Sequence, residues 1–172
     1  MKKTILAVMA MLVSSQVFAI PKQIDVIGLI PDVSTEADVK KSNVGLGDEI
    51  NKIGGYTMIC IPTYIDAKLA QLYCAFGKSV IQESSNEIIY NTLKQGFTKK
   101  FGVPKVTNDK ARNGYGTEFN VQSIVWNDQK GNSLTVYNRF SKVDKGVIIL
   151  KSASLIKAEK EARKLEDASR KF

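Results

Sequence analysis

Cys60 and Cys74 are the side chains best suited to chemistry in this 172-residue chain, which contains no histidine. A redox pair is normally Cys-x-x-Cys, whereas these two cysteines are 14 residues apart. A structural zinc site takes four cysteine or histidine ligands, and two cysteines cannot supply them. We therefore predict a structural disulfide between Cys60 and Cys74, and no metal or other cofactor.

Catalytic sites are hard to build from the remaining residues. Without histidine, Ser-His-Asp and Cys-His sites are excluded, and the chain has no Walker loop or dinucleotide-binding fingerprint. Paired carboxylates could still hydrolyse glycosides. Six acidic residues lie in or beside predicted loops: Asp25, Asp32, Glu36, Asp48, Glu49 and Asp66. Because nothing in the sequence pairs them, we predict that the protein is not an enzyme, and a carboxylate-based carbohydrate-active enzyme is the last alternative.

The N-terminal residues have the pattern of a secretory signal peptide. A basic start at Lys2 and Lys3 precedes the apolar run Thr4–Val13, and small residues stand at Val17 and Ala19. We predict cleavage after Ala19 and a periplasmic or secreted bacterial protein. No transmembrane segment is expected after cleavage, since a span needs about 20 apolar residues. Such a compartment is oxidising, which favours the disulfide.

The charge of the chain is basic but spread out. Removal of Lys2 and Lys3 would lower the formal net charge from +8 to +6. The sequence has no arginine-rich run and no aromatic RNA-stacking motif. We therefore expect no nucleic acid as a partner.

The first half of the mature chain is predicted to begin with a strand at Ile24–Ile30. Thr35 and Asp38 fit a capping box that starts a short helix over Glu36–Ser42. The stretch Asn43–Gly55 contains four glycines and is predicted as a loop.

The two cysteines lie in apolar runs that predict a β-hairpin. Strands are expected at Tyr56–Pro62 and Lys68–Phe76, with Thr63–Ala67 as the loop between them. The disulfide would then join neighbouring strands.

An amphipathic helix is predicted next, with Ser84 and Glu87 as a second capping box. Its apolar stripe, expected in the core, comprises Ile89, Leu93, Phe97 and Phe101, widened by Ile88 and Thr92. Gly102 and Pro104 are expected to end it.

The second half predicts an exposed loop at Val106–Gly116 and a hairpin. The hairpin strands are Val121–Trp126 and Leu134–Phe140, with a turn at Asp128–Asn132. Val147–Leu150 is fully apolar, which suits a central strand and completes a three-stranded meander.

The C-terminal segment has no glycine or proline and is predicted as a helix. Residues spaced by three and four form a thin heptad seam: Leu155, Ala158, Ala162, Leu165, Ser169 and Phe172. We expect this helix to project from about Ala158 onward. Leu155, Leu165 and Phe172 are therefore the candidate contacts to a partner or to a second copy.

Two segments resemble a recurring pattern of small bacterial envelope domains. IGLIPDVSTEADVKK, within Ile24–Lys41, is similar to a stretch that opens a helix there, and KKFGVP, within Phe97–Pro104, to a stretch that ends one. The chain in this respect resembles the SmpA/OmlA type of outer-membrane lipoprotein and the secreted β-lactamase-inhibitory proteins. The resemblance implies a non-enzymatic α+β envelope module that works through contacts.

We thus predict one α+β domain at residues 20–154, with a signal peptide at 1–19 and a helical tail at 155–172. In it, a hairpin and a three-stranded antiparallel meander pack against one amphipathic helix. The expected function is binding of an envelope protein through protein contacts. The alternative is inhibition of a secreted hydrolase such as a lysozyme.

Overall fold

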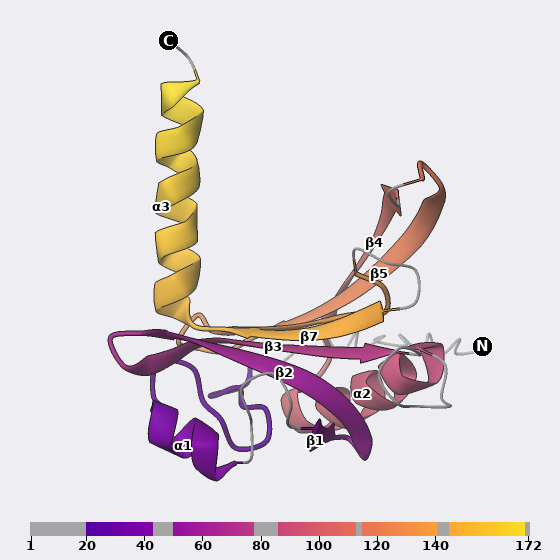
Figure 1. Ribbon diagram of the computed structural model, residues 1–172, viewed down its shortest axis with the longest axis horizontal. Coiled ribbons are helices and arrows are strands. Elements are labelled where there is room, and N and C mark those ends of the chain that lie inside the picture. Colours follow the sequence, from indigo (N-terminus) through magenta and orange to yellow (C-terminus); the bar gives the residue numbers. More distant parts are fainter. Residues whose placement is uncertain (1–19, 43–49, 78–85, 113–114, 141–144, 171–172) are drawn as a thin grey trace, which may run out of the picture.

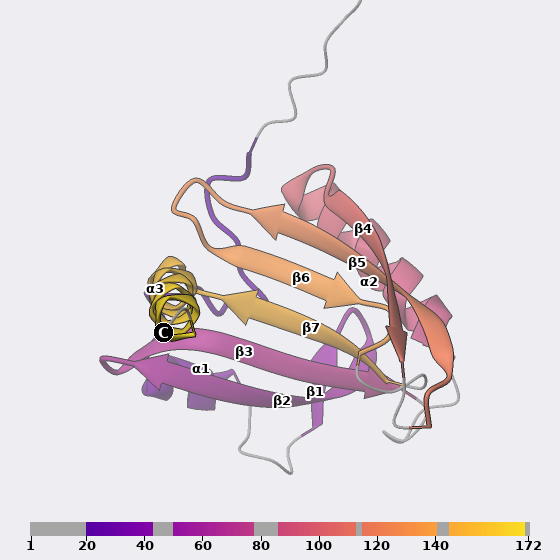
Figure 2. The same cartoon turned by 90° about the horizontal axis from the view of Figure 1, so that it is seen from above.

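The computed structural model describes residues 20–42, 50–77, 86–112, 115–140 and 145–170. Within these ranges, seven antiparallel strands form one curled sheet in the order β1-β2-β3-β7-β6-β5-β4, as Figures 1 and 2 show. The strands are β1 (Ile50–Ile53), β2 (Tyr56–Ile65), β3 (Lys68–Gly77), β4 (Lys105–Arg112), β5 (Glu118–Asn127), β6 (Ser133–Tyr137) and β7 (Lys145–Lys151). The helices are α1 (Glu36–Lys41), α2 (Asn86–Phe101) and α3 (Ala153–Ser169). The predicted α+β class is confirmed.

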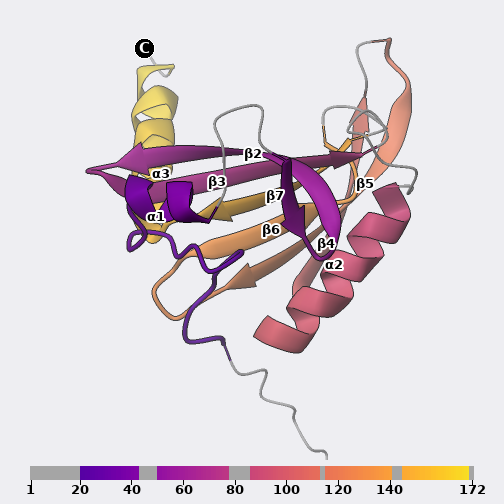
Figure 3. The same cartoon turned by 60° about the horizontal axis from the view of Figure 1, so that its bottom comes forward.

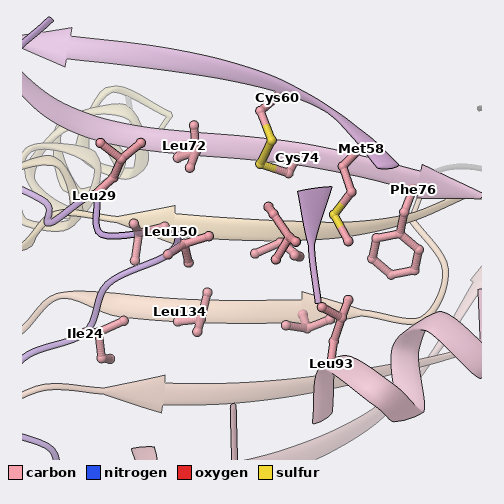
Figure 4. Close-up of a cluster of buried hydrophobic side chains, with 14 of the residues drawn as sticks. Ile24, Leu29, Met58, Cys60, Leu72, Cys74, Phe76, Leu93, Leu134 and Leu150 are labelled. Atoms are coloured by element: carbon pink, nitrogen blue, oxygen red, sulfur yellow. A yellow bond between two sulfur atoms is a disulfide. The ribbon is translucent and has the colours of Figure 1, made fainter. Parts of the chain in front are cut away.

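The hydrophobic core lies between one face of the sheet and the elements that cover it. Figure 3 shows α1, α2 and the N-terminal segment on this face. Alternate strand residues point into the core because strand side chains alternate between the two faces. Figure 4 shows part of the resulting cluster, which includes Ile24, Leu29, Met58, Leu72, Phe76, Leu93, Leu134 and Leu150.

The disulfide joins Cys60 of β2 to Cys74 of β3, as predicted. The two residues are directly opposite in the antiparallel register, and both side chains are fully buried. The hairpin loop is shorter than Thr63–Ala67, because β2 continues to Ile65 and only Asp66 and Ala67 form the turn. Both turn residues have positive φ, 48° and 58°, as a tight two-residue hairpin turn requires.

Local sequence signals fix the N-terminus of α1 and the C-terminus of α2. The Thr35 hydroxyl accepts from the Asp38 backbone N–H at 3.3 Å, and the Asp38 carboxylate accepts from the Thr35 N–H at 2.8 Å. The Thr35 hydroxyl is also within 2.7 Å of the Asp38 carboxylate, and the hydrogen bonds that this carboxylate accepts from the Thr35 backbone N–H and hydroxyl lower the pKa of Asp38. Gly102 follows α2 at φ 85°, where a residue without Cβ is favoured. The predicted cap at Ser84 lies outside the described residues.

The apolar stripe of α2 faces the core as predicted, with three differences, one of which is that Thr92 is exposed. Ile89, Leu93 and Phe101 are buried, whereas Phe97 is half-buried and packs against Phe101 and Trp126. Ile88 is 55% exposed, because its position on the helix turns it away from the sheet.

Three segments differ from the sequence prediction. Ile24–Ile30 is no strand, because Ile27 and Gly28 have positive φ and turn the chain between the bridge partners Val26 and Leu29. The predicted loop Asn43–Gly55 contains β1, and its part at 43–49 lies outside the described residues. The predicted loop Val106–Gly116 is mostly β4. The sheet is therefore wider than the predicted hairpin and meander.

Removal of the disulfide is expected to destabilise the protein. A covalent loop of this length stabilises by about 3 kcal/mol in the chain-entropy model, so Cys60→Ala with Cys74→Ala should lower the free energy of unfolding by about that amount in urea titration. Thiol titration of the denatured wild-type protein should find no free thiol before reduction. Two free thiols in protein taken from the periplasm would contradict the assignment.

Gly146 and Gly96 form a matched pair of glycine-to-alanine tests. A Cβ on Gly146 would lie 2.3 Å from two ring carbons of Phe76, which is fully buried, and 2.8 Å from the Tyr137 carbonyl oxygen. Gly146→Ala should therefore cost about 1–3 kcal/mol of stability. Gly96 lies inside α2 with open space around it, so Gly96→Ala should stabilise by about 0.5–1 kcal/mol. If the two changes had equal effects on thermal unfolding, β7 would not approach Phe76 as closely as these distances indicate.

Candidate binding surface

The sheet face opposite α1 and α2, here called the open face, carries none of the described helices flat upon it. Figure 1 shows α3 rising from this face at one end and the β4–β5 hairpin rising at the other. Strand register places three rows of side chains across it. The first row is Ile59, Ala75, Val147, Tyr137, Ser123 and Thr107; the second is Ile61, Tyr73, Ile149, Thr135, Val125 and Lys105; the third is Thr63, Gln71, Lys151, Ser133 and Asn127.

The centre of the open face is apolar and aromatic. Phe140, just after β6, packs edge-on against Tyr73 at 6.2 Å between ring centroids, and its ring is tilted against that of Tyr137 at 5.3 Å. Burial raises the pKa of the Tyr73 hydroxyl. At the β2 side of the face, Ile59 is 36% exposed and Ile61 is 51% exposed. Val147 in the first row is 1% exposed, so the exposed apolar surface lies at the β2 side of the face. Exposed apolar surface can mark a contact site.

The base of α3 is tied to the sheet by a buried polar cluster in the β5–β6 turn. The Asp128 carboxylate accepts from the backbone N–H groups of Ile24, Lys130 and Asn132, and from the side-chain amide of Asn132. The Asn132 amide oxygen accepts from the Ala153 N–H at 2.9 Å, at the first residue of α3. Asp128 and Asn132 are 5% and 1% exposed, so these hydrogen bonds are sheltered from water.

Three further contacts hold α3 in its raised position. Ser152 is the N-cap, and its hydroxyl accepts from the Leu155 N–H at 3.1 Å. The Asp32 carboxylate accepts from the hydroxyl and the backbone N–H of Ser154. Lys151, on the open face, donates to both oxygens of Glu159 at 2.6 and 2.8 Å. The direction of α3 is therefore fixed at its base, while residues 160–170 are all exposed.

Charges on α3 are sorted around its apolar seam. At 3.6 residues per turn, Glu159 and Glu166 flank one side of the seam and Glu161 flanks the other. The basic residues Lys157, Lys160, Arg163, Lys164 and Arg170 occupy the opposite half of the helix, where Asp167 also lies. The seam is thus bordered by negative charge, and Glu159 and Glu166 also pair with Lys151 and Arg170 of the same chain.

The predicted contact residues lie at different places on α3. Leu155 is half-buried at its base, Leu165 is 73% exposed, and Phe172 lies outside the described residues. Their role in binding remains a prediction.

The acidic residues considered for catalysis each have a local role where they are described. Asp25 pairs with Lys100 at 2.7 Å, and Glu36 with Lys40 at 2.8 Å. Asp32 holds α3, and Asp66 belongs to the β2–β3 turn. Asp48 and Glu49 lie outside the described residues. In the described ranges, no group of three or more acidic or cysteine side chains is arranged to hold a metal ion.

A polar network at the start of α2 was not expected from the sequence. Burial raises the pKa of Tyr90 to about 12, and its hydroxyl donates to the Gln122 side chain at 3.0 Å. The Gln122 amide nitrogen donates to Asn108, and its backbone N–H donates to Asn138. Asn108, Gln122 and Asn138 line a shallow hollow of about 540 Å³ beside β4. In the sequence, the only sign of this network is the polar residues at alternate strand positions, and that pattern also fits an exposed edge strand.

Comparison of this chain with protein-family models, curated proteins and solved structures found no match. None of the described helices is long and apolar enough to cross a membrane.

Asn132 should be required for the attachment of α3. Asn132→Ala leaves the Ala153 N–H and part of the Asp128 carboxylate without their buried partner, which should cost about 2–3 kcal/mol of stability. Hydrogen exchange should show lost protection in the first turn of α3. Asn91→Ala, on the exposed side of α2, is the control and should change stability by less than about 0.5 kcal/mol. Unchanged exchange in α3 of the Asn132 variant would mean that the helix is held by other contacts.

Proposed function

We propose that this chain is a non-enzymatic binding module of the bacterial periplasm or exterior, which acts through protein contacts made by the open face and α3. The observation that carries the proposal is the fixed position of α3 beside an apolar sheet face. Asn132, Asp32 and Lys151 hold the helix away from the sheet, so the helix does not cover this face.

Both parts of the surface have the composition of a protein contact site. The open face has an aromatic centre of Tyr73, Tyr137 and Phe140 with polar and basic residues around it. Interface centres are typically rich in aromatic residues and poor in charge, with a polar rim. α3 adds an exposed helix that includes Leu165.

Compartment and resemblance support the same role. The buried Cys60–Cys74 disulfide is typical of proteins in oxidising compartments, as expected for a secreted chain. The two segments that resemble SmpA/OmlA and β-lactamase-inhibitory proteins contain α1 and the end of α2, both of which border the core. They would support the surface and leave the open face for binding.

A second candidate is inhibition of a secreted hydrolase such as a lysozyme. The observation in its favour is the β4–β5 hairpin, which extends beyond the body of the sheet in Figure 1. Tyr115, between these strands, is 97% exposed. A protruding hairpin with an aromatic residue at its end could enter an active-site cleft. Tyr115→Ala should then abolish inhibition of the hydrolase and leave binding through the open face unchanged.

Removal of residues 160–172 should separate folding from binding. Because every described residue in this segment is exposed, the free energy of unfolding should fall by less than about 1 kcal/mol. The truncated protein should no longer capture partners from an envelope extract, as measured by crosslinking. Val103→Asp, at a position 58% exposed outside the open face, is the control and should retain capture. Loss of soluble expression on truncation would show that this part of α3 serves the core.

A further inference from the structure

We propose that the partner of the open face is α3 of a second copy, so that two copies form a two-fold symmetric dimer. The inference rests on the proposed function and names its partner. In this dimer each copy contributes one helix and one open face, and each helix lies along the open face of the other copy.

The open face cannot be covered by the helix of its own chain. The contacts of Asn132 with Ala153, Asp32 with Ser154 and Lys151 with Glu159 fix the first turns of α3. To lie down on its own sheet, the helix would have to break this partly buried set of hydrogen bonds. A helix from another copy meets no such obstacle.

The two surfaces are complementary in charge as well as in apolar character. The three rows of the open face contain Lys105 and Lys151, and none of their residues is acidic. One row further on the same face lie Lys145, opposite Gly77, and the acidic Asp109 at the β4 edge, opposite Val121. The apolar seam of α3 is bordered by Glu159, Glu161 and Glu166. Lys151 already pairs with Glu159 of its own chain, so a helix whose seam faced Tyr73 and Ile149 would bring the other glutamates of the seam toward Lys105 and Lys145.

Size and symmetry allow the contact to be made twice. α3 has 17 residues, which gives a helix about 25 Å long. The ten-residue strands β2 and β3 are about 33 Å long, so the helix fits along the face. Consider a two-fold axis that bisects the angle between α3 and the strands of its own sheet. Rotation about this axis turns the direction of the helix in one copy into the strand direction of the other copy. Each helix therefore lies along the sheet of the other copy, and the dimer is closed.

A simple coiled coil of two α3 helices is less suited to these residues. The seam contains mainly Ala158, Ala162 and Leu165, and coiled coils need longer and bulkier seams. The seam is also bordered on both sides by glutamate, so paired helices would bring like charges together. A coiled coil of two α3 helices would be weakened by changes on α3 and not by changes on the open face, and the experiment below distinguishes the two arrangements.

Sedimentation velocity tests the dimer with the oxidised chain that begins at Ile20. The wild type should pass from monomer to dimer as the protein concentration is raised from micromolar to hundreds of micromolar. Leu165→Asp on α3 and Ile61→Asp on the open face should each raise the dimer dissociation constant at least about tenfold, because each places a charge in the apolar contact. Both positions are more than half exposed, 73% and 51%, so the fold should be retained. Val103→Asp should dimerise like the wild type.

Mixing the two defective variants gives the decisive result. A heterodimer of Leu165→Asp with Ile61→Asp has one intact contact, between the unchanged helix and the unchanged face. The mixture should therefore dimerise more tightly than either variant alone. If only Leu165→Asp weakens the dimer and mixing restores nothing, the helices pair with each other and the proposal is wrong.

The same variants separate this inference from the proposed function. A wild type that stays monomeric at every concentration overturns the second copy as partner. If Ile61→Asp then still abolishes capture of an envelope protein, the open face binds another protein and the proposed function stands. If neither dimerisation nor capture depends on Ile61 or Leu165, both proposals fail.

Discussion

The buried carboxylate of Asp128 is the interaction on which the arrangement of the outer elements depends. It satisfies three backbone N–H groups, including that of Ile24 in the N-terminal segment, and it orients the Asn132 amide that holds the first residue of α3. A buried carboxylate is costly unless it is fully hydrogen-bonded, and here four donors surround it. One short turn thereby positions both a covering segment of the core face and the helix on the opposite face.

The two faces of the sheet consequently have different roles. On the core face, α1, α2 and the N-terminal segment cover aliphatic residues so completely that Leu72, Leu134 and Leu150 are fully buried. On the open face, Tyr73 and Tyr137 each pack against Phe140. The first face supplies the stability of the domain. The second keeps apolar surface accessible, and the raised helix prevents the chain from covering it.

Local signals in the sequence predicted those elements whose cause is local. The Thr35–Asp38 capping box, the Gly102 stop and the turn with Gly131 depend on neighbouring residues, and their structures agree with the prediction. The Cys60–Cys74 pairing followed from compartment and spacing. β4 was missed because it is an edge strand with both faces largely exposed, so its residues do not alternate in polarity. β1 was missed beside Gly54 and Gly55, which turn the chain into β2.

The surface itself could not be predicted, because it depends on contacts distant in sequence. The open face brings together Tyr73 of β3 and Phe140 after β6, and no spacing in the chain indicates that these rings meet. Likewise, Asp32 appeared as a loop acid, and only the fold places it against Ser154. The run Ile24–Ile30 suggested a strand because it is apolar, but its buried residues Ile24, Val26 and Leu29 belong to a segment that turns at Ile27 and Gly28 and packs under the sheet.

The central position of β7 has a consequence for how the sheet is assembled. This strand joins β3 to β6, although it follows both in the chain. Because a chain is synthesised from its N-terminus, the β1–β3 part and the β4–β6 part are present before residue 145 has been added. Until then the two halves have unpaired edges at β3 and β6, which are open to wrong pairing. The Cys60–Cys74 bond can form during this interval and fix the register of the first half, so that β7 finds one edge already in its final alignment.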